Sequence, residues 1–303
     1  MLDVLVRAGC FVAIIAAGIC LRRVGFFKEA DFGVLSKIVL KITLPAAIIT
    51  NFAGREFDFS LLSLMLIGLG GGLIYMLLAW LLNLRGTRAG AAFDIVNASG
   101  YNIGNFTMPF VQSFLGPTGV IVTSLFDVGN AFVCLGGAYS MGALVQDNAG
   151  FSPKRILKAL VRSVAFDCYV VMTLLAVFKI SIPAPIVSLA QIIGNSNAFL
   201  AMLMIGVGFK LSGSREQVGH IVKILMVRYG VAILLAVGCY MLLPFPLEVR
   251  QTLVILFFSP IASAAPAFTR DLKGDVGLAS AVNSLSIVCS ITLIVGILLV
   301  MQP

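Results

Sequence analysis

An aspartate lies in the middle of an apolar stretch of this sequence. Asp127 follows Thr123 by four residues and precedes Asn130 by three, so the three side chains share one face of a helix. A carboxylate at the centre of a membrane span costs about 2.5 to 3.5 kcal/mol even on the lenient insertion scale, so such a group is a candidate for function. We expect Asp127 to take up and release protons. The alternative is a structural aspartate that is protonated or hydrogen bonded.

Two other apolar stretches are unusually polar and contain proline. The first runs from Asn97 to Pro109, and the second runs from Ser259 to Pro266. Proline lacks an N–H and clashes with the carbonyl one turn earlier, so we expect each helix to open there. An opened helix presents free N–H groups and a partial positive charge, which suit a carboxylate. The alternative is an ordinary proline kink.

The last apolar stretch resembles the one around Asp127, because Asn283, Ser286 and Ser290 also share one helical face. We expect the two polar faces to look at the two opened helices. The predicted substrate contacts are Asn102, Asn105, Asn130, Asn283 and Ser284, and the residues predicted to shape the cavity are Gly104, Pro109 and Pro266.

The composition places these stretches in a membrane. The 303 residues are 60% hydrophobic and only 11% charged, and the mean hydropathy is +1.07. A soluble domain has about 25% charged residues, so an extramembrane catalytic domain and a DNA-binding domain are excluded. At about 20 residues a span, the chain holds roughly ten spans. We expect an all-α integral membrane protein with spans near 3–21, 33–53, 58–82, 90–115, 118–146, 155–179, 185–210, 217–243, 247–270 and 276–300.

The spacing of the two polar, proline-containing spans indicates a duplication. They are the fourth and the ninth, five spans apart, so the second half of the chain is inserted upside down relative to the first. Paired interrupted spans at equivalent positions of inverted halves point to a transporter binding site. We expect five-helix repeats at 1–152 and 153–303, with proline-broken helices 4 and 9 crossing each other.

The basic residues predict the orientation. Thirteen fall in the odd-numbered connections and four in the even-numbered ones or the N-terminal segment, which places the odd connections in the cytoplasm and both termini outside the cell membrane. The net charge of +8 thus reflects topology, not nucleic-acid binding. The thirteen are Arg22, Arg23, Lys28, Arg85, Arg88, Lys154, Arg155, Lys158, Lys210, Arg215, Lys223, Arg270 and Lys273.

Other ionisable residues are weaker candidates. We expect Arg228 to extend to the cytoplasmic interface. Asp94 either pairs with Lys37 and Lys41 near the start of span 2, or these lysines extend to the cytoplasmic interface instead. The single histidine, His220, is expected to be a solvated connection residue. The six cysteines are scattered, so neither a metal nor a cofactor is expected.

Five segments form a recognisable set. They are Leu44-Pro45-Ala46, Asn102 to Pro109, Phe126 to Asn130, Ala264-Ala265-Pro266 and the Asn283 and Ser284 pair. Together they resemble the auxin efflux carrier family, within the bile acid, arsenite and riboflavin transporter superfamily. The resemblance extends over essentially the whole chain. It implies a scaffold of spans 1, 2, 6 and 7, a mobile unit of spans 3–5 and 8–10, transport of small organic anions, and a homodimer.

The sequence therefore predicts a secondary-active transporter of small carboxylates that works by alternating access and is not an enzyme. The alternative is a sodium-coupled symporter of the bile acid type, because carbonyls freed at the breaks, together with Asp127 and Asn130, could bind a hard cation. An intramembrane hydrolase would need Asp94 and Asp127 as a catalytic pair. A receptor without transport activity is a further possibility.

Overall fold

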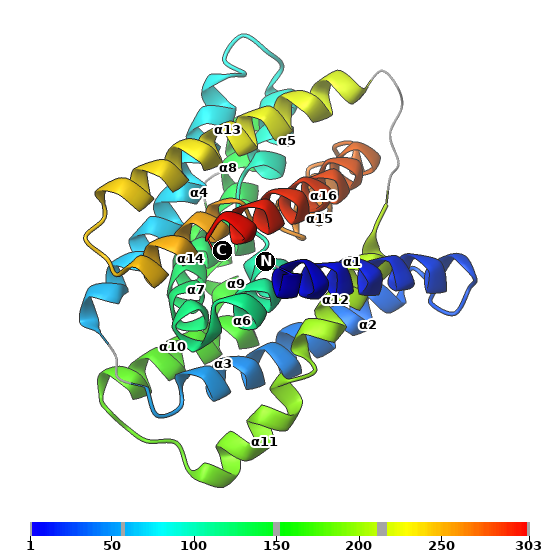
Figure 1. The fold of residues 1–303 in the computed structure, drawn as a ribbon. Coiled ribbons are helices and arrows are strands. Elements are labelled where there is room, and N and C mark those ends of the chain that lie inside the picture. The colour runs from blue at the N-terminus through cyan, green and yellow to red at the C-terminus, as the bar shows by residue number, and fades with distance from the viewer. Residues whose placement is uncertain (1, 56–57, 148–151, 211–216, 302–303) are drawn as a thin grey trace.

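The computed structural model describes residues 2–55, 58–147, 152–210 and 217–301, and every regular element among them is a helix (Figure 1). The predicted all-helical class is confirmed. Arg215 and the terminal residues Met1 and Pro303, which bear on the predicted orientation, lie outside the described residues.

The described residues of the first half of the chain form eight α-helices and four shorter helical turns. They are α1 (Leu2–Arg23), α2 (Asp31–Ile38), the π-helical η1 (Val39–Thr43), α3 (Leu44–Phe52), the 3-10 helix η2 (Phe59–Ser63), α4 (Leu64–Leu81), α5 (Arg88–Ala98), the π-helical η3 (Ile103–Thr107), α6 (Met108–Phe114), α7 (Gly116–Phe132), the π-helical η4 (Val133–Gly137) and α8 (Ala138–Asp147).

Eight α-helices also lie in the part of the second half that the structure describes. They are α9 (Pro153–Leu160), α10 (Val164–Val177), α11 (Ala184–Gly194), α12 (Asn197–Gly208), α13 (Val218–Leu242), α14 (Leu247–Phe257), α15 (Ala265–Asp271) and α16 (Val276–Met301). Helices of the first half pack against helices of the second half, as α1 does with α12 and α3 does with α11.

Seven helical segments among the described residues are long and apolar enough to cross a membrane, or eight if α9 and α10, which meet at a bend of 75°, count as one span. The two expected spans at 90–115 and 247–270 are divided among shorter helices, so they fall short of this length. The count of ten spans remains a prediction.

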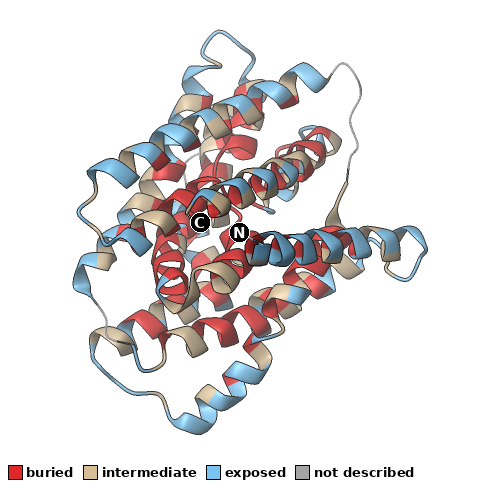
Figure 2. Ribbon diagram, viewed as in Figure 1, coloured by how far each residue is buried: buried red, intermediate tan, exposed pale blue. Residues whose placement is uncertain are grey.

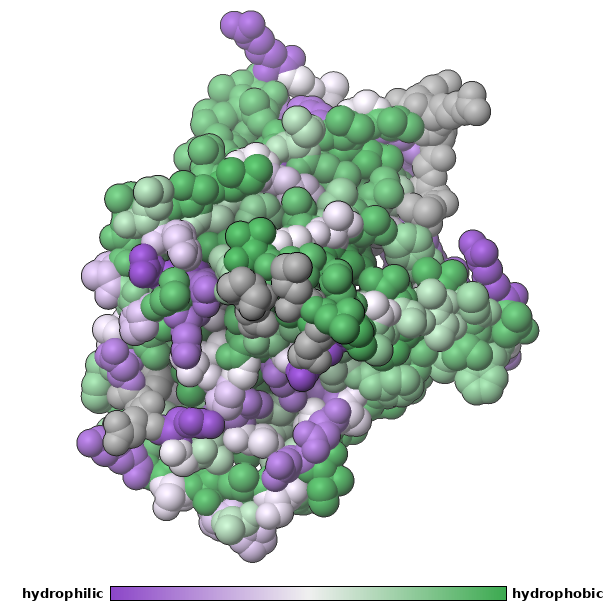
Figure 3. Space-filling view, viewed as in Figure 1, coloured by the Kyte–Doolittle hydropathy of each residue, from purple (hydrophilic) through white to green (hydrophobic). Residues whose placement is uncertain are grey.

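The outer surface is that of a membrane protein. Apolar residues cover much of the visible face, and hydrophilic ones lie at its upper and right-hand tips and in groups over its left and lower part (Figure 3). Leu234 and Met241 on α13 are each 74% exposed, and Ile192 on α11 is equally exposed. Such apolar exposure is unfavourable in water and normal in lipid. Buried residues gather instead along α7 and the neighbouring helix ends (Figure 2).

The first interruption does not lie at its proline. Pro109 lies in the first turn of α6, but the π-helical η3 (Ile103–Thr107) runs directly into α6, so the helical chain is open earlier, at residues 99–102. Gly100 has a φ of +76°, a conformation that glycine adopts readily. In the second interruption, Pro266 lies in the first turn of α15, where the missing N–H costs little, just after the open segment 258–264. Pro266 thus lies where the second helix of its pair begins, whereas the second helical segment of the first pair begins at Ile103, before Pro109.

Candidate functional site

The two interrupted segments touch each other. Tyr101 and Ile261 form an isolated antiparallel bridge, and the Asn102 N–H donates to the Pro260 carbonyl at 2.9 Å. A Cβ atom at Gly100 would lie 2.9 Å from Cys134 Sγ and 3.3 Å from the Ala262 Cβ. Glycine therefore permits the close approach of the two backbones, which we call the crossing (residues 99–102 and 258–264).

Asn130 on α7 holds the first segment. Its Oδ1 accepts from the Tyr101 N–H, and its Nδ2 donates to the Tyr101 carbonyl, both at 2.9 Å. The same Nδ2 donates to Asp127 Oδ1 at 2.8 Å. Because the open backbone lacks helical hydrogen bonds, the side-chain amide replaces them. Asn130 is thus engaged with the protein through both ends of its amide.

Asn283 and Ser286 on α16 hold the second segment in a similar manner. Asn283 Nδ2 donates to the carbonyls of Ile261 and Ala262 at 3.0 and 3.2 Å. The Ile261 N–H donates to Ser286 Oγ at 3.1 Å. Both predicted polar faces therefore reach the open backbone, and each binds the segment of its own half of the chain.

Side chains also join the two segments directly. Thr107 Oγ1 donates to Ser259 Oγ at 2.6 Å, and Asn105 Nδ2 donates to Ser263 Oγ at 3.1 Å. Asn105 Oδ1 is buried and has no hydrogen-bond partner among the described residues. An acceptor that is left free in this way can receive a hydrogen bond from a bound molecule.

A cavity of about 250 Å³ lies on one side of the crossing. The predicted contacts Asn102, Asn105, Asn283 and Ser284 line it together with Ser263 and Pro266. Its other lining residues include four charged side chains, namely Arg22, Glu29, Lys210 and Arg270. Lys210 Nζ hydrogen bonds to Glu29, and this bond holds the pKa of the Glu29 carboxyl group below its usual value. With three cations and one carboxylate, these four groups carry a net positive charge.

A second cavity, of about 120 Å³, lies on another side of the crossing. It is lined by Gly104, Asp127 and Asn130, and by Tyr169 on α10. Asn102, Asn105 and Ser263 line both cavities, so they form the wall between them. A Cβ at Gly104 would lie 2.9 Å from Leu44 Cδ2, so the glycine lets η3 pack closely against α3.

The structure brings together eight of the nine predicted site residues at these two cavities. Pro109 is the exception, because it is buried and lines neither cavity. No substrate is present, and the roles of all nine remain predictions.

Arg228 is a site residue that the sequence analysis misplaced. It was expected at the membrane interface, but its side chain is fully buried and contacts the crossing. It lies ten residues after Val218, the first residue of α13, which is about 15 Å along a helix. An arginine side chain at that depth cannot easily reach the interface. The position of Arg228 within its apolar stretch could have indicated this from the sequence alone.

The apolar, all-helical fold around the crossing is consistent with the result of comparing the sequence with known families. Residues 8–149 match the model of the membrane transport protein family, which is the family of the auxin efflux carriers. The match covers α1 to α8, including Asp127 and Asn130, whereas the resemblance was expected over the whole chain. No curated protein matches this sequence. The family and the apolar helices indicate a multi-pass membrane transporter, and members of this family are not enzymes.

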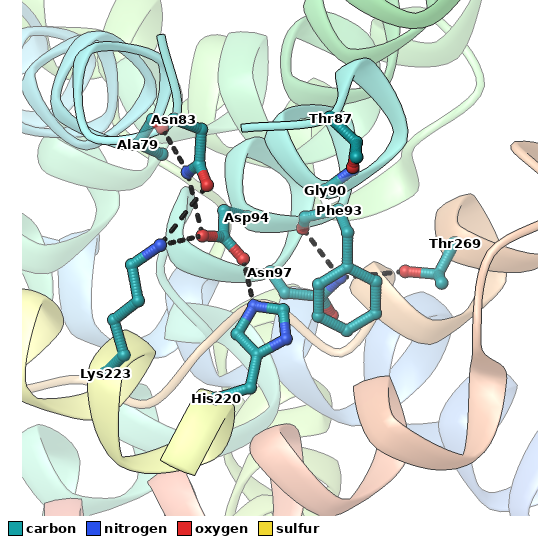
Figure 4. Close-up of polar contacts among 10 residues, drawn as sticks. All are labelled: Ala79, Asn83, Thr87, Gly90, Phe93, Asp94, Asn97, His220, Lys223 and Thr269. Carbon is teal, nitrogen blue, oxygen red and sulfur yellow. Dashed lines mark hydrogen bonds and ion pairs between the residues drawn. The ribbon is translucent and has the colours of Figure 1, made fainter. Parts of the chain in front are cut away.

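The transporter has a further buried carboxylate away from the crossing (Figure 4). Asp94 on α5 contacts His220 Nε2 at 2.5 Å and Lys223 Nζ at 3.0 Å, both on α13, and it accepts from Asn83 Nδ2 at 2.8 Å. His220 thus lies half-buried on α13 with Asp94 as its hydrogen-bond partner, and not in a solvated connection. Asp94 pairs with these groups, whereas Asp127 hydrogen bonds Asn130, so the aspartyl pair of the hydrolase alternative finds no support.

Proposed function

We propose that this membrane transporter carries small organic anions by secondary-active transport and alternating access, and that the substrate binds at the crossing. The observation that supports this most directly is the cavity of about 250 Å³. Its amide and hydroxyl groups can hydrogen bond a carboxylate, and Arg22, Lys210 and Arg270 favour an anion. Asn102 has no side-chain hydrogen bond to any described residue, so its amide is available to a ligand.

The proposal assigns different roles to the predicted contacts. Asn102, Asn105 and Ser284 contact the substrate. Asn130 and Asn283 mainly position the open backbone, because their amides already bind Tyr101 and Ile261. Asn283 also lines the larger cavity and adds its Oδ1 as an acceptor there.

We also propose that the chain consists of two inverted five-helix repeats. Two equivalent interactions support this arrangement. Asn130 binds the backbone of Tyr101 in the first half, and Asn283 binds the backbone of Ile261 in the second, so in each half an asparagine binds the open backbone of the preceding broken helix. The packing of α1 on α12 and of α3 on α10 and α11 supports a scaffold formed by spans 1, 2, 6 and 7. A homodimer, a location in the cell membrane, and extracytoplasmic termini complete the proposal.

Proton coupling through Asp127 is favoured over sodium coupling. Asp127 lines the smaller cavity beside Tyr169 and faces no cation there among the described residues. Asn130 Oδ1 accepts from both the Tyr101 N–H at 2.9 Å and Cys134 Sγ at 3.1 Å, so both of its lone pairs are engaged and it is not free to bind sodium. A carboxyl group in such a site can alternate between its protonated and ionised forms during the cycle.

Substrate binding to purified protein tests the proposal. A panel of small mono- and dicarboxylates should contain members that raise the unfolding temperature in proportion to their concentration, because a ligand that binds only the folded state stabilises it. Transport of these members into proteoliposomes should follow. Binding without transport would instead favour a receptor.

A further inference from the structure

The unusual group at the crossing is a buried arginine. Arg228 has no measurable exposure, and among the described residues no carboxylate lies within ion-pair distance of it. A guanidinium group is always charged in proteins. A buried charge must be compensated, so its partners show what this residue does.

Those partners are backbone carbonyls of both interrupted segments. Arg228 Nη1 donates to the Ala98 carbonyl at 2.8 Å, where α5 ends. Its Nη2 donates to the carbonyls of Ser259 and Pro260 at 3.0 and 3.3 Å, just after α14 ends. One guanidinium group therefore joins the C-terminal ends of two helices from the two halves of the chain.

Two tyrosine rings complete the site. The Arg228 guanidinium carbon lies 4.6 Å from the ring centres of both Tyr75 and Tyr101, within the range of cation–π interactions. The Tyr75 hydroxyl also donates to the Arg228 carbonyl at 2.8 Å. The arginine is thus held in place by its own backbone and by the aromatic rings.

Each helix C-terminus has a partial negative charge of about half an electron and unpaired carbonyls. Two such ends at one place in a membrane protein attract a cation, and freed carbonyls are ligands of sodium and other hard cations in broken-helix transporters. Here the guanidinium group already occupies them.

We propose that Arg228 is a built-in cation that takes the place of a bound metal cation at the crossing, so that the crossing forms and the transporter works without sodium. The statement about transport rests on the proposed function. The statement about the crossing does not, because it concerns the folded structure alone.

The first test compares ions on the unaltered protein. Its unfolding temperature and its carboxylate transport should be the same in sodium chloride and in N-methylglucamine chloride of equal ionic strength. Stability or transport that requires sodium would overturn the proposal. If no carboxylate is transported at all, the proposed function fails, and the unfolding temperature still decides the role of Arg228.

The second test replaces the cation. Arg228→Ala should lower the unfolding temperature by about 5 °C or more, because several carbonyls lose their partner. Low millimolar guanidinium chloride should restore much of this loss relative to N-methylglucamine chloride, since the free ion fits the vacated site. The unfolding temperature of Arg228→Lys should lie between those of Arg228→Ala and the unaltered protein. The reason is that an ammonium group keeps the charge but is a compact point charge that lacks the planar fork of donors.

Arg250→Ala is the matched control. Arg250 also donates to a carbonyl, that of Tyr240 at 2.9 Å, and also faces a tyrosine ring, but it lies away from the crossing. Guanidinium should not stabilise this variant. Equal rescue of both variants, or no rescue of Arg228→Ala, would overturn the proposal. If Arg228→Ala does not yield folded protein, Arg228→Lys and the ion comparison decide the question.

Discussion

Asn130 binds both backbone groups of Tyr101, the N–H through Oδ1 and the carbonyl through Nδ2, each at 2.9 Å. A helix that opens inside a membrane must find new partners for its backbone, and a side-chain amide offers one donor group and one acceptor in the required geometry. Asn130 therefore satisfies the backbone of Tyr101 in the first open segment, as Asn283 and Ser286 do for Ile261 in the second.

Replacement of Asn130 by alanine should destabilise the protein by about 1 to 3 kcal/mol, because the Tyr101 N–H and carbonyl lose the amide partner. Thermal unfolding in detergent measures the effect. Asn51→Ala is the control, since Asn51 Nδ2 donates to the Ala47 carbonyl of its own helix at 2.7 Å and is only half-buried. Equal losses in the two variants would contradict the special role of Asn130.

The Asp94 cluster should show strong coupling in a mutant cycle. His220→Ala or Lys223→Ala alone leaves one of the two α13 partners beside the buried carboxylate, whereas the double variant leaves only Asn83. The loss of unfolding free energy in the double variant should exceed the sum of the single losses by about 1 kcal/mol or more. Adding Asp94→Asn to the double variant should recover part of the lost unfolding free energy, because the substitution removes the uncompensated charge. Simple additivity would contradict the ion-pair account.

The sequence predicted the main features of this fold through strong local signals. The hydropathy and length of the apolar stretches identified most spans, and the polar segments around Asn102 and Ser263 identified the two interruptions. Helix i, i+3 spacing placed Asp127 and Asn130 on one face, and the structure joins them by a hydrogen bond.

The sequence could not reveal partners that are distant along the chain. The contacts of Arg228 with Ala98 and Ser259 depend on how three helices pack, and no local pattern encodes that packing. His220 was read as a solvated residue for the same reason, since Asp94 is 126 residues away. The opening at 99–102 was assigned to Pro109 because a proline is visible in a sequence and the φ of Gly100 is not.

Asp127→Asn tests proton coupling. The amide keeps the size and much of the hydrogen bonding of the carboxylic acid but cannot ionise. Transport driven by an imposed pH gradient should fall to background in proteoliposomes, while exchange between equal substrate pools persists. A structural aspartate would instead show altered stability with an unchanged response to pH. Normal pH-driven transport by this variant would remove Asp127 from the coupling mechanism.

Glu29→Gln tests the sign of the substrate charge. The substitution removes the carboxylate that pairs with Lys210, so the charged lining of the larger cavity becomes more positive. An anionic substrate should bind about twofold to tenfold more tightly at low ionic strength, and the gain should shrink as salt is added. Because the Glu29 pKa is lowered, the ionised carboxylate of the unaltered protein persists as the pH falls until that lowered pKa is reached. Weaker binding in the variant would indicate a cationic substrate.

The most direct test of the account is counterflow of a radiolabelled carboxylate in proteoliposomes that contain Asn105→Leu or Asn97→Leu. Both asparagines are buried, but Asn105 lines both cavities, whereas Asn97 donates to Thr269 Oγ1 and lines neither. The substrate should be a carboxylate that stabilises the unaltered protein, and each variant is compared at equal amounts of folded protein. We expect Asn105→Leu to reduce counterflow at least about tenfold through loss of a substrate hydrogen bond and of space, and Asn97→Leu to retain most of it. Full counterflow by Asn105→Leu would show that the substrate does not pass through the crossing.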